Sequence, residues 1–170
     1  MLPKSYIFWK WTVYSLATLL LSALQYLVLN QIRVFDIYPF LYPMLPAVLS
    51  SYEGYRRGTI FSLCLGVACD LLLVGPFEGF FTLVFTMIGL LSGLIAENLL
   101  SPGYLCSLTV SSMALLLTGF FRMAVQMLTG GGHLLLMIRI TVVESLLSLP
   151  ALFVIVPLYQ FICRRCANDY

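Results

Sequence analysis

The sequence predicts an all-α integral membrane protein, a compact bundle of six transmembrane helices. Long apolar segments follow one another with short connectors, the mean hydropathy is +1.01, and only 9% of the residues are charged. A spanning helix needs about 20 apolar residues, so a chain of 170 residues has room for these segments but not for a separate soluble domain. We therefore expect residues 1–170 to form a single transmembrane domain.

The second of the predicted spans differs from the others. The six segments, in order, are Tyr6–Leu29, Tyr38–Ser51, Gly58–Val74, Phe80–Glu97, Leu105–Thr129 and Leu134–Ile162. The prolines Pro39, Pro43 and Pro46 crowd the second segment, which is barely long enough to cross. Proline removes backbone donors and kinks helices, so we expect this element to be short, bent or partly re-entrant, and sheltered by its neighbours.

Basic residues in the short connectors predict the orientation. With a cytoplasmic N-terminus, the inner side receives Lys4, Lys10, Arg56, Arg57, Arg164 and Arg165, whereas the outer side receives Arg33 and Arg139. Cytoplasmic loops of membrane proteins carry an excess of Lys and Arg, so both termini are predicted to be cytoplasmic (N-in/C-in). No basic stripe suggests a nucleic-acid partner.

Small and polar residues recur at helical spacing within the spans. The third carries Gly58, Ser62, Gly66 and Asp70, the fourth carries Thr82, Thr86, Gly89, Gly93 and Glu97, and the first carries Ser15, Thr18, Ser22 and Gln25. Positions three or four apart share a helix face, and small residues mark close helix contacts in lipid. Gly66, Gly89 and Gly93 are therefore predicted to be helix-packing residues.

Three ionisable residues lie well inside predicted spans, namely Asp70, Arg122 and Glu144. Their positions along the helices bring Arg122 within reach of either acid, so we expect one buried polar cluster. Such a cluster either binds a ligand or partner, relays protons or holds a conformation, or it is an internal ion pair that fixes helix order. The structural interpretation is favoured, because breaking a buried pair is costly even when forming it gains little.

No catalytic, cofactor or metal set is predicted, so the chain is not expected to be an enzyme. The only histidine, His133, follows three glycines in an outer loop, where a solvated turn residue is expected. Cys163 and Cys166 form one Cys-x-x-Cys pair without further ligands, a weak zinc signal for which an incidental pair or a lipidation site is the simpler explanation. Glu97 is expected to pair with Arg56 or Arg57, or to face water.

The middle third of the chain resembles the bacterial rod-shape-determining MreD family. The features that carry the resemblance are the proline-bearing second span, the turn Gly54-Tyr55-Arg56-Arg57-Gly58, the pattern Gly66-x-x-x-Asp70-Leu71-Leu72, the turn 75–79 and the glycine-bearing fourth span. They cover about residues 38–97. The remainder agrees in size, span count and hydrophobicity.

The resemblance implies a non-enzymatic scaffold of the cell-elongation (rod) complex in the bacterial inner membrane. In that family the protein binds MreC, a single-span protein, and through it connects to MreB and to the RodA/penicillin-binding protein synthase pair that builds sidewall peptidoglycan. The family is thought to share the fold of the S-components of energy-coupling-factor transporters. Asp70 is the motif residue carried over, in a structural or partner-facing role, and pairing with a second copy of the chain is left open.

The alternative is a substrate-binding S-component of a vitamin transporter. Arg122, Gln126, Asp70 and His133 would then line an outer pocket. Two features weigh against it: the first span lacks the Ala-x-x-x-Ala pattern of such proteins, and the connector 30–37 is too short for a lid.

Overall fold

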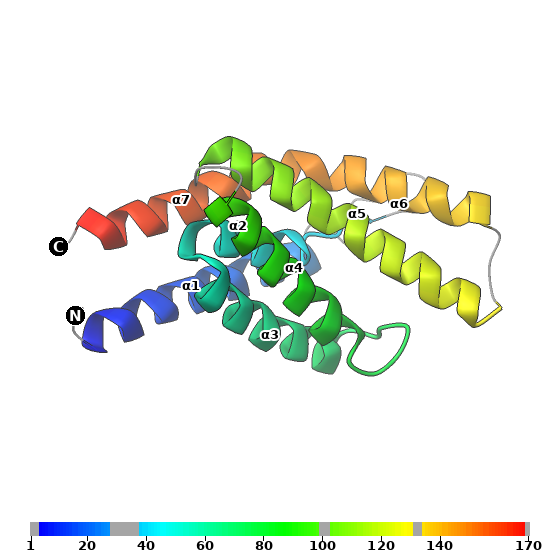
Figure 1. Ribbon diagram of the computed structural model, residues 1–170, viewed down its shortest axis with the longest axis horizontal. Coiled ribbons are helices and arrows are strands. Elements are labelled where there is room, and N and C mark those ends of the chain that lie inside the picture. The colour runs from blue at the N-terminus through cyan, green and yellow to red at the C-terminus, as the bar shows by residue number, and fades with distance from the viewer. Residues whose placement is uncertain (1–3, 28–37, 99–102, 131–133, 169–170) are drawn as a thin grey trace.

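The computed structural model describes residues 4–27, 38–98, 103–130 and 134–168, and within these ranges it is helical without strands (Figure 1). The helices are α1 (Lys4–Leu27), α2 (Met44–Glu53), α3 (Tyr55–Leu72), α4 (Phe80–Asn98), α5 (Tyr104–Leu128), α6 (Leu134–Ser148) and α7 (Leu152–Asn168), with a 3-10 turn, η2 (Leu149–Ala151), between the last two. Each of the six predicted segments therefore contains helix.

Three of the described helical segments are long and apolar enough to cross a membrane. They are Phe80–Asn98, Tyr104–Leu128 and the run Leu135–Cys163, which includes most of α6 and α7. The chain thus has the helices of a membrane protein. The expected sixth span is not one uniform helix, because it passes through η2 at Pro150 and continues with Pro157 inside α7.

The second predicted span is helical only over α2, whose ten residues reach about 15 Å at 1.5 Å per residue, half of a bilayer core. Residues 38–40 are irregular and lead through a turn into the helix. Pro43 stands at the N-cap with φ −67°, and Pro46 lies in the first turn, where a missing N–H breaks no helical bond. The prolines therefore position the start of a short helix.

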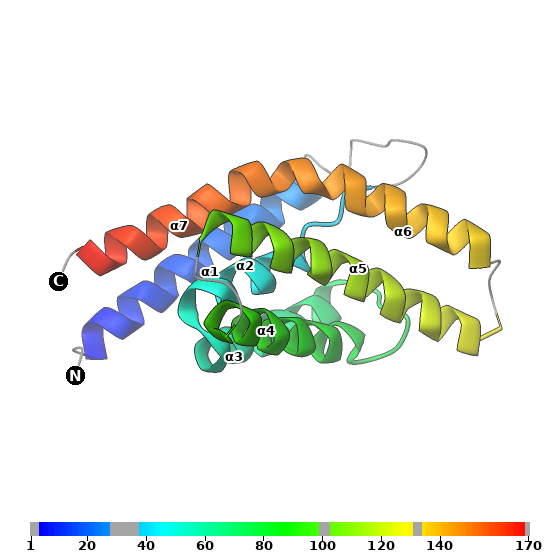
Figure 2. The same ribbon diagram turned by 45° about the horizontal axis from the view of Figure 1, so that its top comes forward.

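The short helix α2 is sheltered by its neighbours, as the prolines predicted. Every residue from Met44 to Ser51 is buried, and α2 contacts α3, α4, α5 and α7. Figure 2 shows it among the longer helices. Its apolar side chains join two clusters, one with α1 and α7 around Val48 and Tyr159, the other with α4 and α5 around Val84 and Phe85.

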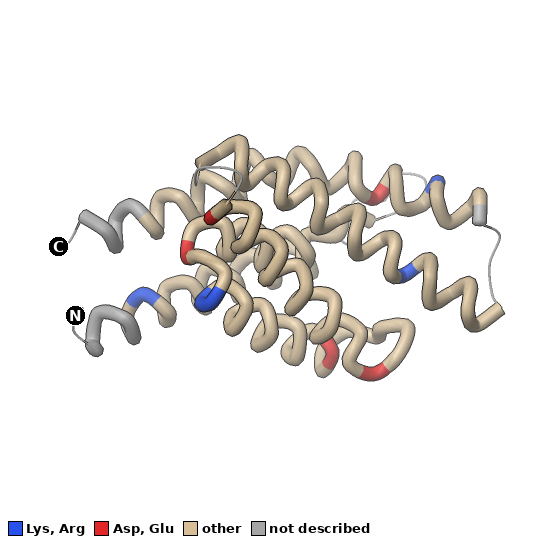
Figure 3. Tube along the Cα trace, viewed as in Figure 1, with Lys and Arg blue, Asp and Glu red and all other residues tan. Residues whose placement is uncertain are grey.

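Both termini lie at one end of the molecule (Figure 1). Charged residues gather at that end and again along the far parts of the helices, while the stretch between them is almost free of charge (Figure 3). At the terminal end, Glu53 at the end of α2 forms ion pairs with Lys10 and Arg57 and accepts a hydrogen bond from Tyr14. This cluster joins α1, α2 and α3.

Candidate functional site

Asp70 stands in the last turn of α3, where its carboxylate caps the beginning of α4. Oδ1 accepts the backbone N–H of Phe81 at 2.9 Å, and Oδ2 accepts the backbone N–H of Thr82 at 2.8 Å as well as its hydroxyl. The first N–H groups of a helix have no partner within the helix, and a carboxylate there is further favoured by the helix dipole. The hydrogen-bond partners of the Asp70 carboxylate are therefore the first N–H groups and a hydroxyl of α4.

Gly66, one turn before Asp70, is the reason that α4 comes so close. A Cβ at this position would overlap the backbone of Phe81 and Thr82. Gly89 and Gly93 act at the same contact from the side of α4, since a Cβ on either would overlap Ser62 or the backbone of Tyr55. The three glycines therefore pack α3 against α4, the role that their spacing predicted.

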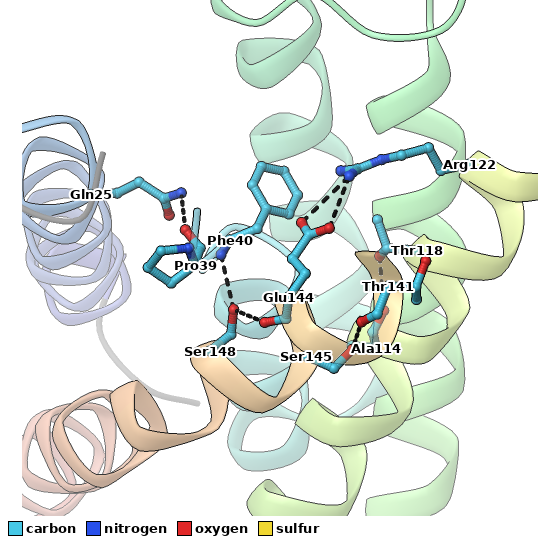
Figure 4. A network of polar contacts seen from close by, with 10 residues as sticks. All are labelled: Gln25, Pro39, Phe40, Ala114, Thr118, Arg122, Thr141, Glu144, Ser145 and Ser148. Atoms are coloured by element: carbon cyan, nitrogen blue, oxygen red, sulfur yellow. Dashed lines mark hydrogen bonds and ion pairs between the residues drawn. The ribbon is translucent and has the colours of Figure 1, made fainter. Parts of the chain in front are cut away.

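Arg122 of α5 and Glu144 of α6 form an ion pair with Nη1 and Oε2 3.0 Å apart. The two side chains are 31% and 14% exposed, and the guanidinium lies 5.4 Å from the centre of the Phe40 ring. Figure 4 shows the pair beside the irregular segment that precedes α2. This position is suited to an arginine, which stacks on aromatic rings while it binds a carboxylate.

The expectation of one cluster containing Asp70, Arg122 and Glu144 is wrong. The structure makes two sites, because Asp70 is used by the N-terminus of α4 while Arg122 binds Glu144. The sequence shows how far along its helix each residue lies, and by this measure both Asp70 and Glu144 are close to Arg122. The direction in which each helix faces decides the partner, and that depends on packing.

A cavity of about 360 Å³ opens next to the Arg122–Glu144 pair. Its walls come from the end of α1, the segment before α2, the end of α3, and α5 and α6. They are Gln25, Tyr26, Tyr38, Pro39, Phe40, Tyr42, Leu73, Arg122, Ile140 and Glu144. The volume falls within the range of about 300–1,000 Å³ that is common for small-molecule sites. Neither Asp70 nor Gln126 belongs to these walls.

Two side chains hold the irregular segment in place and had not been identified as site residues. Gln25 donates to the carbonyl of Pro39 at 3.1 Å and accepts the N–H of Leu41 at 2.8 Å. Ser148 accepts the N–H of Phe40 at 2.9 Å and donates to the carbonyl of Glu144, as Figure 4 shows. Irregular backbone at membrane depth needs such partners. In the sequence, Gln25 is the last residue of the polar face of the first span, and this was the one sign that its side chain has a partner inside the bundle.

The other predicted polar residues are distributed over the molecule. Glu97 is exposed, in agreement with the second of its two expected roles, and it also caps α3 by accepting the backbone N–H of Tyr55 at 3.0 Å. In the described part of the chain it forms no ion pair with Arg56 or Arg57, and Arg56 donates to the hydroxyl of Tyr55. His133 and the side chain of Cys166 lie outside the described residues. Within the described part of the chain, no group of three or more His, Cys, Asp or Glu residues could hold a metal ion.

Fold and site together define the class: a helical membrane protein with an internal cap at Asp70 and an ion-paired cavity at Arg122. Comparison with known proteins adds no relative to this description. No protein-family model, no curated protein and no solved structure matches the chain.

Proposed function

We propose that this chain is a non-enzymatic scaffold of the bacterial cell-elongation complex, similar to MreD, in the inner membrane. Its ionisable groups carry the proposal. Of the acidic residues that the structure describes, all but Glu78 bind groups of another helix, namely Glu53, Asp70, Glu97 and Glu144. Carboxylates used in this way hold helices together, which is what a scaffold requires.

The segments on which the resemblance rests form one packed unit. Residues 38–97 include α2, α3 and nearly all of α4. Within this unit the motif residues Gly66 and Asp70 act on a single contact, since the glycine admits α4 and the carboxylate caps it. We interpret the motif as the element that preserves this unit, so that the lipid-facing sides of the outer helices remain for partners.

The proposal includes six crossings with both termini in the cytoplasm. Besides the three apolar spans, α1 and α3 have about 36 Å and 27 Å of helix at 1.5 Å per residue. The irregular segment together with α2 would supply the remaining crossing. Both termini lie at the end where Lys10 and Arg57 bind Glu53, and an excess of basic residues is typical of the cytoplasmic side.

In this role the chain would bind an MreC-like single-span protein and act through it on MreB and the RodA/penicillin-binding protein pair. A partner helix gains little from apolar contact in lipid and associates through close packing. No enzymatic step is assigned to the chain.

Depletion of the protein in its source bacterium tests the proposal. We expect rod-shaped cells to become round and re-expression of the wild-type chain to restore the rods. Affinity purification in mild detergent should also recover a single-span protein with a large external domain, which a tagged unrelated membrane protein of similar size should not. Cells that keep their shape after full depletion would contradict the proposal.

One observation favours a second candidate, the S-component of a vitamin transporter. The cavity beside Arg122 has the size of a small-molecule site. This candidate predicts that depletion slows growth only in medium without the vitamin and leaves cell shape unchanged, so the same depletion distinguishes the two functions.

A further inference from the structure

The cavity beside Arg122 and Glu144 combines one ion pair with an otherwise aromatic and aliphatic wall. Its volume of about 360 Å³ lies within the range that is common for small-molecule sites. The side chain of Gln25 donates one N–H to the carbonyl of Pro39 and accepts the N–H of Leu41. On the described part of the wall, the charged groups are those of the ion pair, and the other polar side chains besides Gln25 are the tyrosines Tyr26, Tyr38 and Tyr42.

Both members of the pair keep unused hydrogen-bonding capacity. Within the described ranges, the carboxylate of Glu144 is bound through Nη1 of Arg122 alone, at 3.0 Å to one oxygen and 3.4 Å to the other. Among the described residues, Nε and Nη2 of Arg122 have no acceptor. A guanidinium has five N–H donors and a carboxylate has about four acceptor positions, so each can accept a further partner of opposite charge.

The rest of the wall suits the remainder of such a molecule. Phe40 already carries the guanidinium on its ring face at 5.4 Å, and Tyr38 and Tyr42 add further rings. Aromatic faces attract ammonium groups as well as guanidinium groups. Three lining residues reach the outer surface of the helices: Tyr26 and Ile140 are 73% and 36% exposed, and Leu73 is half-buried. The lining therefore extends to the surface where lipid acyl chains would lie.

We propose that this cavity binds a zwitterion in which an anionic group and an ammonium group are neighbours, as in an ethanolamine phosphate headgroup. The phosphate oxygens would accept from the free edge of Arg122, and the ammonium would donate to Glu144 beside the aromatic rings. The headgroup can belong to a membrane lipid or to a free solute, because the recognising chemistry is the same. The inference does not depend on the proposed scaffold role.

Native mass spectrometry of the full chain, purified in mild detergent and exchanged into lipid, provides the test. The probes are phosphatidylethanolamine, phosphatidylcholine with its trimethylated ammonium, and phosphatidylglycerol without an ammonium. We expect ethanolamine lipid to be retained about tenfold more than either of the others, because only it supplies both a phosphate and an N–H donor.

Two variants and two matched controls locate the binding. Arg122→Gln removes the phosphate partner, and Ile140→Trp fills the cavity while both members of the ion pair remain present. Each should reduce retention of the ethanolamine lipid about tenfold. The controls Arg139→Gln and Ile138→Trp, on exposed positions of α6 that do not line the cavity, should leave retention unchanged. Because Ile140→Trp keeps the ion pair, it remains informative if Arg122→Gln does not fold.

A competition arm distinguishes the two sources of the headgroup. In one outcome, the protein shows no preference among the lipids but binds soluble phosphoethanolamine in detergent, and Ile140→Trp abolishes that binding. The occupant is then a free solute, and the proposed recognition by Arg122 and Glu144 is supported. Equal retention of all three lipids together with no binding of phosphoethanolamine would overturn the proposal. So would equal losses in Ile140→Trp and Ile138→Trp.

Discussion

Asp70 and Glu144 are both carboxylates on apolar helices, and their environments differ. Asp70 is bound by two backbone amides and a hydroxyl of α4, whereas Glu144 is bound by one nitrogen of Arg122 at the wall of a cavity. The Asp70 carboxylate binds backbone N–H groups at the start of α4, which have no partner within their own helix. The Glu144 carboxylate faces a cation that has donors to spare.

The difference shows how the same residue type serves structure in one place and can serve recognition in another. The cap at Asp70 is complete, because Gly66 brings the amides of α4 within hydrogen-bonding distance. The carboxylate of Glu144, by contrast, is bound by a single side-chain nitrogen in the described part of the chain. Substitutions at the first site should therefore change stability, while those at the second should change stability less and binding more.

Asp70→Ala should have the largest effect on stability. It leaves the N–H groups of Phe81 and Thr82 without their charged acceptor, and we expect a loss of about 3 kcal/mol in the free energy of unfolding. Equilibrium unfolding in mixed micelles measures it. Glu78→Ala, in the exposed turn next to α4, is the matched control and should cost less than about 0.5 kcal/mol. Equal losses in the two variants would contradict the capping role.

Gly66→Ala should follow, at about 2 kcal/mol, because the added methyl group overlaps the backbone of α4 and forces the helices apart. The same unfolding measurement applies. The control Ala68→Leu adds more volume on the exposed side of α3 and should leave stability nearly unchanged. A tolerated Gly66→Ala would mean that the two helices are not in close contact here.

Arg122→Met should cost about 2 kcal/mol, below the 3–5 kcal/mol of a fully buried pair, because both side chains keep some exposure. The loss arises mainly from the carboxylate that remains unpaired. The double variant Arg122→Met/Glu144→Met should therefore recover at least half of it. Thermal unfolding followed by size-exclusion chromatography measures both, and a double variant less stable than Arg122→Met would rule out this explanation.

Ser148→Ala should have the smallest effect, about 1 kcal/mol, from the loss of the acceptor for the N–H of Phe40. The control is Ser145→Ala on the same helix, whose hydroxyl bonds only to the carbonyl of Thr141 one turn before. The difference between the two variants isolates the contact with the irregular segment. No difference would show that this contact contributes nothing to stability.

Hydropathy and residue spacing predicted the placement of the helices well. The fourth segment, expected at Phe80–Glu97, is found at Phe80–Asn98, because a continuous apolar run begins after Gly79 and ends at the polar residues Glu97 and Asn98. In the second segment the three prolines indicated a short element but not where it begins. Proline is tolerated in the first turn of a helix, so α2 starts at Met44, before Pro46. Residues 38–43 of the expected segment do not belong to the helix.

The partners of the charged residues were harder to predict. Position along a helix placed Arg122 near both acids, but it did not show that Asp70 binds the start of α4 while Arg122 binds Glu144. The glycine roles were predictable from the sequence, because Gly89 and Gly93 repeat on one face. Gln25 could be noticed as the last polar residue on one face of the first span, but its partners and those of Ser148 belong to an irregular backbone that exists only in the folded bundle.

The burial of α2 has a consequence for biogenesis. This ten-residue helix contacts α3, α4, α5 and α7, all of which follow it in the chain. Synthesis proceeds from the N-terminus, so the segment leaves the ribosome before any of these four helices. Too short to span the hydrocarbon core by itself, it reaches its final environment only after the last helix has been made, and assembly of the bundle is completed around it.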